Sequence, residues 1–221
     1  DYWLNHFRYL RATGEVNCLW AQFNEAMAAV KTEKDAAAGK KRAAETALPI
    51  RIRLVAAVGE AHRHLLSAIS TTGGIGNVTN WQQHILPRLL EGPGAELERL
   101  LGAPLPPEAR PGHAYAGPPR LFIPEVRTSI DAGEALNITA VVLGSAIREF
   151  GLFHRPLGRG EFARQAFAPL GRGVHQAVLP ARAIRDDFEY YVECLPETGA
   201  ALRFPAAAPA VTQTVIVMRP E

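Results

Sequence analysis

The spacing of apolar residues changes once along the chain, from a helical period in the first half to alternation in the second. Over residues 2–31 large apolar side chains recur every three or four positions, the period of an α-helix with one apolar face. In the second half they alternate with polar ones, as at Leu136, Ile138 and Ala140, which is typical of a strand that buries one side. We therefore predict an α+β chain in two segregated parts.

The first part, residues 1–102, is predicted to be a helical bundle or hairpin. One long helix covers residues 2–31, and a second runs over about 49–70, because Pro49 suits the first turn of a helix. The Lys-, Glu- and Ala-rich stretch 31–47 is expected to form a solvated helix or hairpin tip. The expected buried stripes are Trp3, Phe7, Leu10, Val16, Trp20, Phe23, Met27 and Val30 in the first helix, and Ile52, Val55, Val58, His62, Leu65, Leu66 and Ile69 in the second.

Three glycines at positions 73, 74 and 76 predict a break after the second helix. Thr79 and Gln82 have the spacing of a capping box, so a new helix is expected to begin near Asn80 and to bend at Pro87. Gly92-Pro93-Gly94 would separate it from a last short helix at 95–101.

Residues 103–119 are rich in proline and glycine and predict an extended linker. The remainder, residues 120–221, is predicted to be an antiparallel β-sandwich of immunoglobulin or fibronectin type, because short strands are separated by turn residues every 8–14 positions. Strands are expected near 120–128, 134–143, 148–155, 161–168, 173–179, 187–195, 200–204 and 211–218.

Composition narrows the classes of function. Twenty-four basic residues nearly balance 22 acidic ones, so nucleic acid is not an expected partner. No apolar run has the ~18 residues of a membrane span, and no pattern requires a cofactor. Cys18 and Cys194 are expected to be buried free thiols. His62 and His64 lack the i, i+4 spacing of a helical metal pair, so we expect no metal site.

The polar, glycine-rich run from Thr72 to His84 is the first candidate binding site. Amides can hydrogen-bond sugar hydroxyls and an indole can stack on a pyranose ring, which makes Asn80, Trp81, Gln83 and His84 candidate carbohydrate contacts. A helix beginning near Asn80 could also hold an anion. The alternative is a purely structural role, in which Trp81 fills the core.

The second candidate is one face of the strand at 187–193. Phe188, Tyr190 and Val192 are expected to face the core, which turns Tyr191 outward with its charged neighbours. Exposed aromatic residues there could form a sugar platform. No paired carboxylates in an apolar setting, nucleophile elbow or activated thiol is evident, so catalytic residues stay unassigned.

Two stretches carry resemblances to known proteins. Residues 173–180 and 187–193, with Phe204-Pro205 and Ala208-Pro209, resemble fibronectin- or immunoglobulin-like modules of secreted bacterial proteins. Residues 2–9 (YWLNHFRY) and 80–84 (NWQQH) are similar to the helical region that follows the barrel in large bacterial glycoside hydrolases of the α-glucuronidase or hexosaminidase type. That likeness implies catalytic carboxylates upstream of Asp1, and none can be assigned here.

The leading hypothesis is a C-terminal, non-catalytic part of a secreted or periplasmic bacterial carbohydrate-active enzyme. Because aromatic residues stand at helical spacing from the first turn, the helices are expected to support an upstream catalytic domain of the same polypeptide. Carbohydrate is the candidate ligand. Two alternatives stay open: a non-enzymatic glycan- or protein-binding scaffold, and a self-contained enzyme with a site between the two halves.

Overall fold

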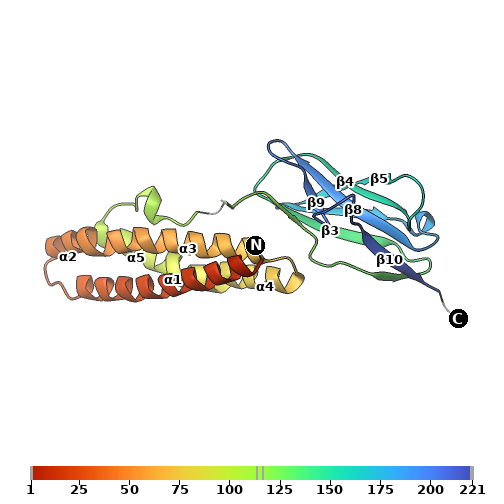
Figure 1. Cartoon of the computed structure of the whole chain (residues 1–221). Helices are drawn as coiled ribbons and strands as arrows, with labels where there is room; N and C mark the ends of the chain where they lie inside the picture. The colour runs from red at the N-terminus through yellow and green to blue at the C-terminus, as the bar shows by residue number, and fades with distance from the viewer. Residues whose placement is uncertain (1, 113, 116, 220–221) are drawn as a thin grey trace. The chain divides into compact units, whose positions relative to one another are not determined.

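The computed structural model describes residues 2–112, 114–115 and 117–219. The chain divides into two compact units, a helical one within the first 116 residues and a β one that begins at residue 117 (Figure 1). The predicted α+β class with two segregated parts is confirmed.

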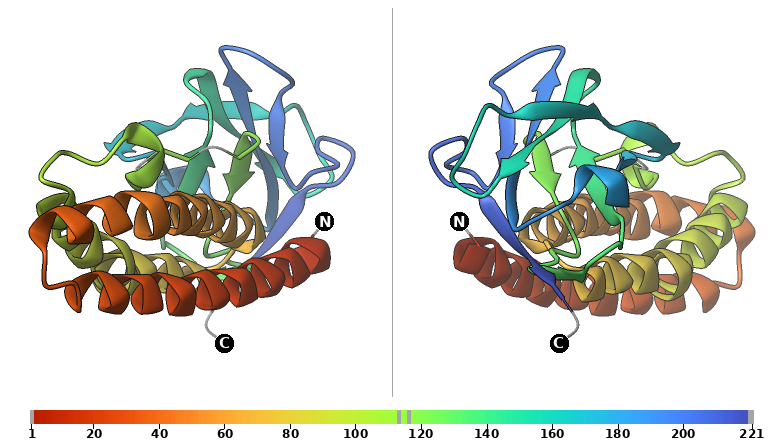
Figure 2. Two further views of the ribbon diagram at one scale, coloured as in Figure 1. Left: turned by 90° about the vertical axis from the view of Figure 1, so that its left-hand side faces the viewer. Right: turned by 90° about the vertical axis from the view of Figure 1, so that its right-hand side faces the viewer.

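Three long helical segments build the helical unit. The first is α1 (Tyr2–Lys31). The second runs without a break through α2 (Ala36–Arg42), η1 (Ala43–Ala47) and α3 (Leu48–Ala68). The third runs through α4 (Thr72–Asn80), η2 (Trp81–Ile85), η3 (Pro87–Glu91) and α5 (Gly92–Leu101). Helices α1 and α3 lie side by side along the length of the unit (Figures 1 and 2).

Asp35 begins the second segment. Its carboxylate accepts a hydrogen bond from the backbone N–H of Ala38 at 2.7 Å, which is the geometry of an N-cap. The segment therefore starts at Ala36, 13 residues before Pro49, which instead lies inside it. The expectation that the second helix begins at Pro49 is wrong.

Three prolines lie inside these helices, and each follows a π-helical turn after one intervening residue. The residues before Pro49, Pro87 and Pro93 donate to carbonyls five positions back, as Leu48 does to Ala43. Proline lacks an N–H and its ring collides with the carbonyl four residues earlier. A π turn widens the helix at that point and accommodates the ring, so proline does not end the helix.

The glycine-rich run is helical, which corrects the predicted loop. Thr72–Asn80 forms α4, and Thr79 lies within it, where its hydroxyl donates to the carbonyl of Ile75 at 3.2 Å. Thr79 is therefore not an N-cap, and no helix begins at Asn80. The predicted break at Gly92-Pro93-Gly94 is absent for the same reason as at Pro49.

The core of the helical unit differs from the predicted stripes in two places. In α1 the buried positions begin at Ala12 and continue through Leu19 and Phe23, whereas Trp3, Phe7 and Leu10 are exposed. In α3 the buried residues are Arg51, Leu54, Ala57, Val58, Ala61, His64, Leu65 and Ala68. Val58, Leu65 and Ile69 of the predicted stripe are buried, whereas the other buried positions of α3 lie on a face rotated from the predicted one.

The two cysteines have different environments. Cys194 is buried in the sandwich, as expected, whereas Cys18 is exposed on α1. Leu19 occupies the core position next to it, so the expectation of a buried thiol at Cys18 is wrong.

Part of the predicted linker packs on the helices. Leu105 and Ala109 are buried, and Ala109 lies in η4 (Pro107–Ala109), which packs against α3. The backbone N–H of Leu105 donates to Glu98 at 2.9 Å, and Arg51 Nε donates to the carbonyl of Ala109 at 3.1 Å. These bonds hold residues 105–109 on the helical unit.

Within its described residues the β unit has ten strands: β1 (Arg120–Phe122), β2 (Ser129–Asp131), β3 (Leu136–Leu143), β4 (Ile147–Pro156), β5 (Ala163–Ala166), β6 (Ala168–Gly171), β7 (Val174–Leu179), β8 (Phe188–Pro196), β9 (Leu202–Phe204) and β10 (Gln213–Met218). All eight predicted strands have a counterpart. The short strands β2 and β6 have too few residues to show alternation, and the sequence did not predict them.

These strands make two sheets whose order is that of an immunoglobulin-type sandwich. One sheet has the order β1-β3-β7-β6, and the other β2-β10-β8-β4-β5, with β9 beside β8. The pairing is antiparallel except between β2 and β10, which run parallel. The core between the sheets includes Ile138, Phe150, Leu152, Tyr190 and Val192.

Candidate binding faces

The four residues predicted to contact sugar from the helical unit do not face one way. Asn80, Gln83 and His84 are exposed on the third helical segment, whereas Trp81 is buried. A helix places residues one apart about 100° from each other, so this separation follows from the helical conformation. Contact of the three exposed side chains with sugar stays a prediction.

Trp81 belongs to the packing between the three helical segments. Its Nε1–H donates to Tyr9 Oη on α1 at 3.0 Å, and its ring stacks near His62 of α3 with centroids 6.4 Å apart. A buried indole with its donor satisfied is a structural residue. Trp81 therefore fills the core of the helical unit, which is the role expected as the alternative to sugar contact.

The two histidines of α3 lie next to this contact. Nδ1 of His64 and Nε2 of His62 are buried and make no hydrogen bond within the described chain. Burial lowers the pKa of His62. Burial, and then the nearby Arg63, lower the pKa of His64 despite the carboxylate of Glu60 at 3.6 Å. Neutral imidazole is thus the form that this part of the unit accommodates.

The solvent-facing side of β4 and β8 in the sandwich carries aromatic and charged side chains. The strand register places Arg155 opposite Glu189, and Phe153 opposite Tyr191. These four side chains point away from the core, because Leu152, Tyr190 and Val192 between them are buried. Alternation along β8 was predicted, and the structure confirms it. We call Phe153, Arg155, Phe162, Arg164 and Tyr191 the aromatic face.

Three aromatic rings gather at the centre of the aromatic face. The rings of Phe153 and Tyr191 are stacked with centroids 4.8 Å apart and planes 4° apart, and Phe162 meets Tyr191 edge-on at 5.0 Å. The guanidinium of Arg155 lies 4.2 Å from the centre of the Phe162 ring, in cation–π geometry. All three rings are partly exposed, which is unusual for the solvent side of an antiparallel sheet.

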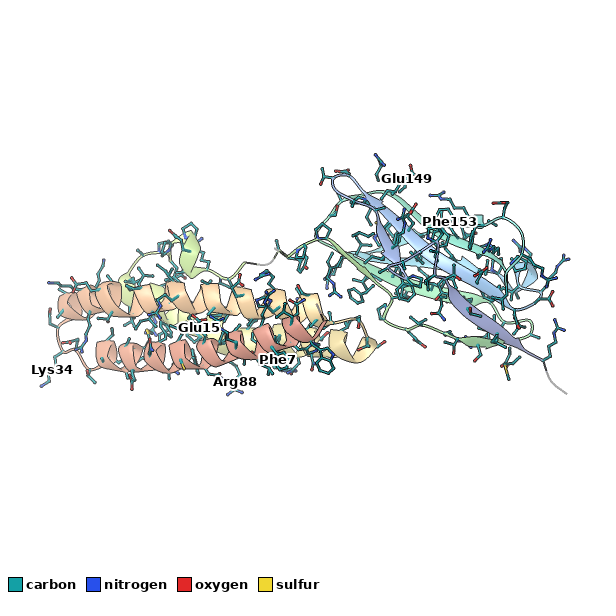
Figure 3. All side chains as sticks on the ribbon, viewed as in Figure 1. Phe7, Glu15, Lys34, Arg88, Glu149 and Phe153 are labelled. Carbon is teal, nitrogen blue, oxygen red and sulfur yellow. The ribbon has the colours of Figure 1, made fainter. Side chains whose placement is uncertain are left out.

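Gly151 leaves room for this arrangement. A Cβ atom at Gly151 would lie 2.9 Å from Cε2 of Phe153 and 2.9 Å from Nε of Arg164. Both side chains therefore lean over the bare backbone of β4, and any larger residue would displace them. The space beside Gly151 is thus filled by the side chains of Phe153 and Arg164 (Figure 3 labels Phe153).

Glu189 holds Arg155 of the aromatic face in position. Its carboxylate accepts hydrogen bonds from Arg155 Nε at 2.7 Å, from Gly158 N at 3.1 Å and from the Thr212 hydroxyl. The Thr212 hydroxyl, together with Arg155, holds the pKa of this carboxyl below its usual range. With its acceptors occupied, Glu189 orients Arg155 and anchors the turn after β4.

Sequence reasoning identified Tyr191 but missed its neighbours. Phe153 and Arg155 are far from Tyr191 along the chain, and the register of β4 with β8 brings them near it. Phe162 reaches Tyr191 from the loop after β4. Alternation in β4 could have signalled Phe153 as outward-facing. The loop position of Phe162 carries no such signal.

The described residues contain neither a candidate metal site nor a candidate membrane-spanning helix. No group of three or more histidine, cysteine or acidic side chains there could hold a metal ion. None of the described helices is long and apolar enough to cross a membrane.

Comparison with known proteins leaves the family open. No protein-family model matches the chain, and no curated protein matches its sequence. One of the solved structures with a similar chain is described as "Structural basis of T cell specificity and activation by the bacterial superantigen toxic shock syndrome toxin-1". That match covers 46% of this chain and 100% of the other, with 9% identity and a TM-score of 0.34.

Proposed function

We propose that this chain is a non-catalytic, glycan-binding part of a bacterial carbohydrate-active enzyme, and that the aromatic face is its binding surface. The observation that carries the proposal is the cluster of three partly exposed rings beside Arg155 and Arg164. Pyranose rings present C–H groups on their faces and hydroxyls around their edges. Aromatic rings suit the former, and guanidinium and carboxylate groups suit the latter.

The stacking within the cluster defines how a sugar would approach. Phe153 and Tyr191 cover one face of each other, so a ligand meets ring edges and the outer ring surfaces. Arg164, which lies against Gly151 beside Phe153, then offers its guanidinium to sugar hydroxyls. A shallow, open surface of this kind suits a chain end or a side branch of a polysaccharide, bound weakly and without chemical change.

Glycan-array binding of the whole chain, followed by calorimetry on the strongest ligand, tests the proposal. We expect Tyr191→Ala and Phe153→Ala each to weaken binding at least about ten-fold, which corresponds to ~1.4 kcal/mol. Val178→Ala is the matched control, because Val178 is exposed on a strand of the other sheet. No binding to any glycan, or equal binding by all variants, would contradict the proposal.

A second candidate is a protein-binding scaffold. It is favoured by the exposed apolar side chains of Leu4, Phe7 and Leu10 on α1, since exposed apolar patches mark interaction sites. In the leading hypothesis these side chains face the catalytic domain. The supporting role would be contradicted if the catalytic domain of the full-length protein kept its activity after residues 1–116 were deleted.

A further inference from the structure

The proline-rich segment 104–109 (PLPPEA) docks on the helical unit through few side chains. Leu105 is 4% exposed and Ala109 0%. Pro107 and Glu108, which lie between them, are exposed. Burial of apolar surface is the main favourable contribution to such a contact, and here one leucine and one alanine supply most of it. The segment is therefore held much more weakly than the long helices are held to each other.

Two charged side chains of the helices hold the segment by its backbone. Arg51 of α3 donates from Nε to the carbonyl of Ala109 at 3.1 Å, and Glu98 of α5 accepts from the N–H of Leu105 at 2.9 Å. Burial lowers the pKa of Arg51, and the nearby charge of Glu98 partly offsets this effect. Each of the two charges therefore keeps a neighbour of opposite sign when the segment moves away.

The docked arrangement leaves one donor of Arg51 without a partner. Its side chain is only 1% exposed, and Nη1 is buried and makes no hydrogen bond within the described chain. An unpaired donor on a buried cation destabilises the arrangement that buries it. Water or Glu98 can accept from Nη1 once the segment moves away, so this donor favours release.

Proline keeps the segment extended whether it is docked or not. Pro104, Pro106 and Pro107 have no N–H, and Pro106 has φ −63° and ψ 157°, the polyproline II conformation. A segment that is already extended loses little backbone entropy on docking, and it exposes few unpaired donors on release. Such a contact can open and close while the helices beside it stay folded.

We propose that residues 104–109 form a reversible latch, which is closed on Arg51 in this structure and opens while the helices stay folded. Opening adds these six residues to the connection between the two units, which lengthens it by up to about 20 Å at roughly 3.4 Å per residue. The latch therefore sets how far the sandwich, with its aromatic face, can reach from the helical unit. The proposal does not depend on glycan binding.

Hydrogen exchange of the whole chain, followed by mass spectrometry, tests whether the latch opens on its own. The amides of Ala109 and Arg110 donate to carbonyls of the same turn, so they are protected while the latch is closed. We expect them to exchange at least about 100-fold faster than the amides in the central turns of α3, because local opening costs less than unfolding. Equally slow exchange in the two segments overturns the proposal.

Proteolysis tests the part that Arg51 plays in the latch. Endoproteinase Glu-C cuts after glutamate, and the buried Ala109 keeps the bond after Glu108 out of its reach while the latch is closed. We expect Arg51→Gln to raise the rate of this cut at least about ten-fold, because the rate follows the population of the open form. Arg53→Gln is the matched control, since Arg53 is exposed on the same helix. A cut that is no faster in Arg51→Gln than in Arg53→Gln overturns the proposal.

Leu105→Ala weakens the latch without touching the helices. Leu105 lies beyond the end of α5, so its truncation removes a buried anchor of the latch and leaves the three helical segments intact. We expect the cut after Glu108 to become at least about ten-fold faster, while circular dichroism at 222 nm stays that of the wild-type protein. A cut that becomes faster only together with a loss of helical signal overturns the proposal, because the segment would then be released by unfolding alone.

Discussion

Glu189 shows how one side chain fixes the position of several others. Its carboxylate is nearly buried on the outer side of β8 and ties together β4, the turn after it and the segment before β10. A buried carboxylate with three donors is stabilising only while all three bonds are made. Loss of its charge should therefore affect both stability and the aromatic face.

Glu189→Gln is expected to lower the free energy of unfolding of the sandwich by about 1.5–3 kcal/mol, the usual value of hydrogen bonds to charged groups. Glutamine keeps the shape but lacks the charge that attracts Arg155, and its amide offers one acceptor oxygen in place of two. Urea unfolding of residues 117–221, which contain Tyr190 and Tyr191 and no tryptophan, followed by tyrosine fluorescence measures the change.

Glu193→Gln is the matched control for Glu189→Gln. Glu193 also points outward from β8 and accepts a hydrogen bond from an arginine, Arg203, at 2.6 Å. This pair is more exposed to solvent, so its loss should cost only about 0–1 kcal/mol. Equal effects of the two substitutions would contradict the role assigned to Glu189.

At the scale of single elements, the long helices contain one glycine that has no room for a side chain and one that has room. At Gly94 a Cβ atom would lie 2.8 Å from Nη2 of the buried Arg51. Burial lowers the pKa of Arg51 to about 10, so it stays charged at neutral pH and needs its contacts. At Gly59, in the exposed side of α3, a Cβ atom would have no heavy atom within 4 Å.

The two glycines should therefore respond in opposite directions to alanine. Gly59→Ala is expected to stabilise the helical unit by about 0.5–1 kcal/mol, because alanine loses less backbone entropy in a helix. Gly94→Ala should destabilise it by about 1–3 kcal/mol through overpacking against Arg51. Thermal unfolding followed at 222 nm compares them. A stabilised Gly94→Ala protein would mean that Arg51 moves freely.

Element prediction from sequence succeeded where periodicity was long and failed where local signals competed with packing. Alternation placed the strands β4 and β8 correctly along the chain, and in β8 it also gave the inward face. Proline and glycine around Pro49 and residues 72–94 predicted helix ends, yet the structure keeps the helices continuous. The sequence does not encode a π turn in any simple pattern, because the turn forms only when tertiary packing holds the helix together across the proline.

The candidate site was predictable only in part for a related reason. Tyr191 could be assigned outward from its own strand. Its pairing with Phe153, and the edge contact from Phe162, depend on the register between distant strands and on a loop. Among the helical candidates, Trp81 turns inward because α4 continues into η2 where a loop was expected. The exposed Asn80, Gln83 and His84 stay predicted sugar contacts.

At the scale of the whole molecule, the two units have separate cores. The apolar cluster of the sandwich contains residues from 123 to 215 only, and two sheets of this size can fold independently. We expect residues 117–221, produced alone, to unfold cooperatively with the same midpoint as the sandwich in the whole chain, within a few degrees. Differential scanning calorimetry of both proteins measures this. A fragment that unfolds without a heat-absorption peak would contradict it.

The two units should also differ in their response to acid, and the tryptophans make the difference measurable. Trp3, Trp20 and Trp81 all lie in the helical unit, so tryptophan fluorescence reports that unit alone. Burial lowers the pKa of both His62 and His64 below their unfolded value near 6.5. The unfolded state then binds more protons, so the stability of the helical unit falls as the pH drops below about 6.5.

We therefore expect the urea midpoint of the tryptophan transition to fall steadily between pH 7 and pH 5. The double substitution His62→Gln, His64→Gln should flatten this dependence, because glutamine does not titrate. His84→Gln should leave it unchanged, since His84 is exposed on the third helical segment. The carboxyl of Glu189, whose pKa is lowered, adds acid sensitivity to the sandwich only below about pH 4.5. A tryptophan midpoint that stays constant from pH 7 to pH 5 would show that the two histidines of α3 accept protons without opening the helical unit.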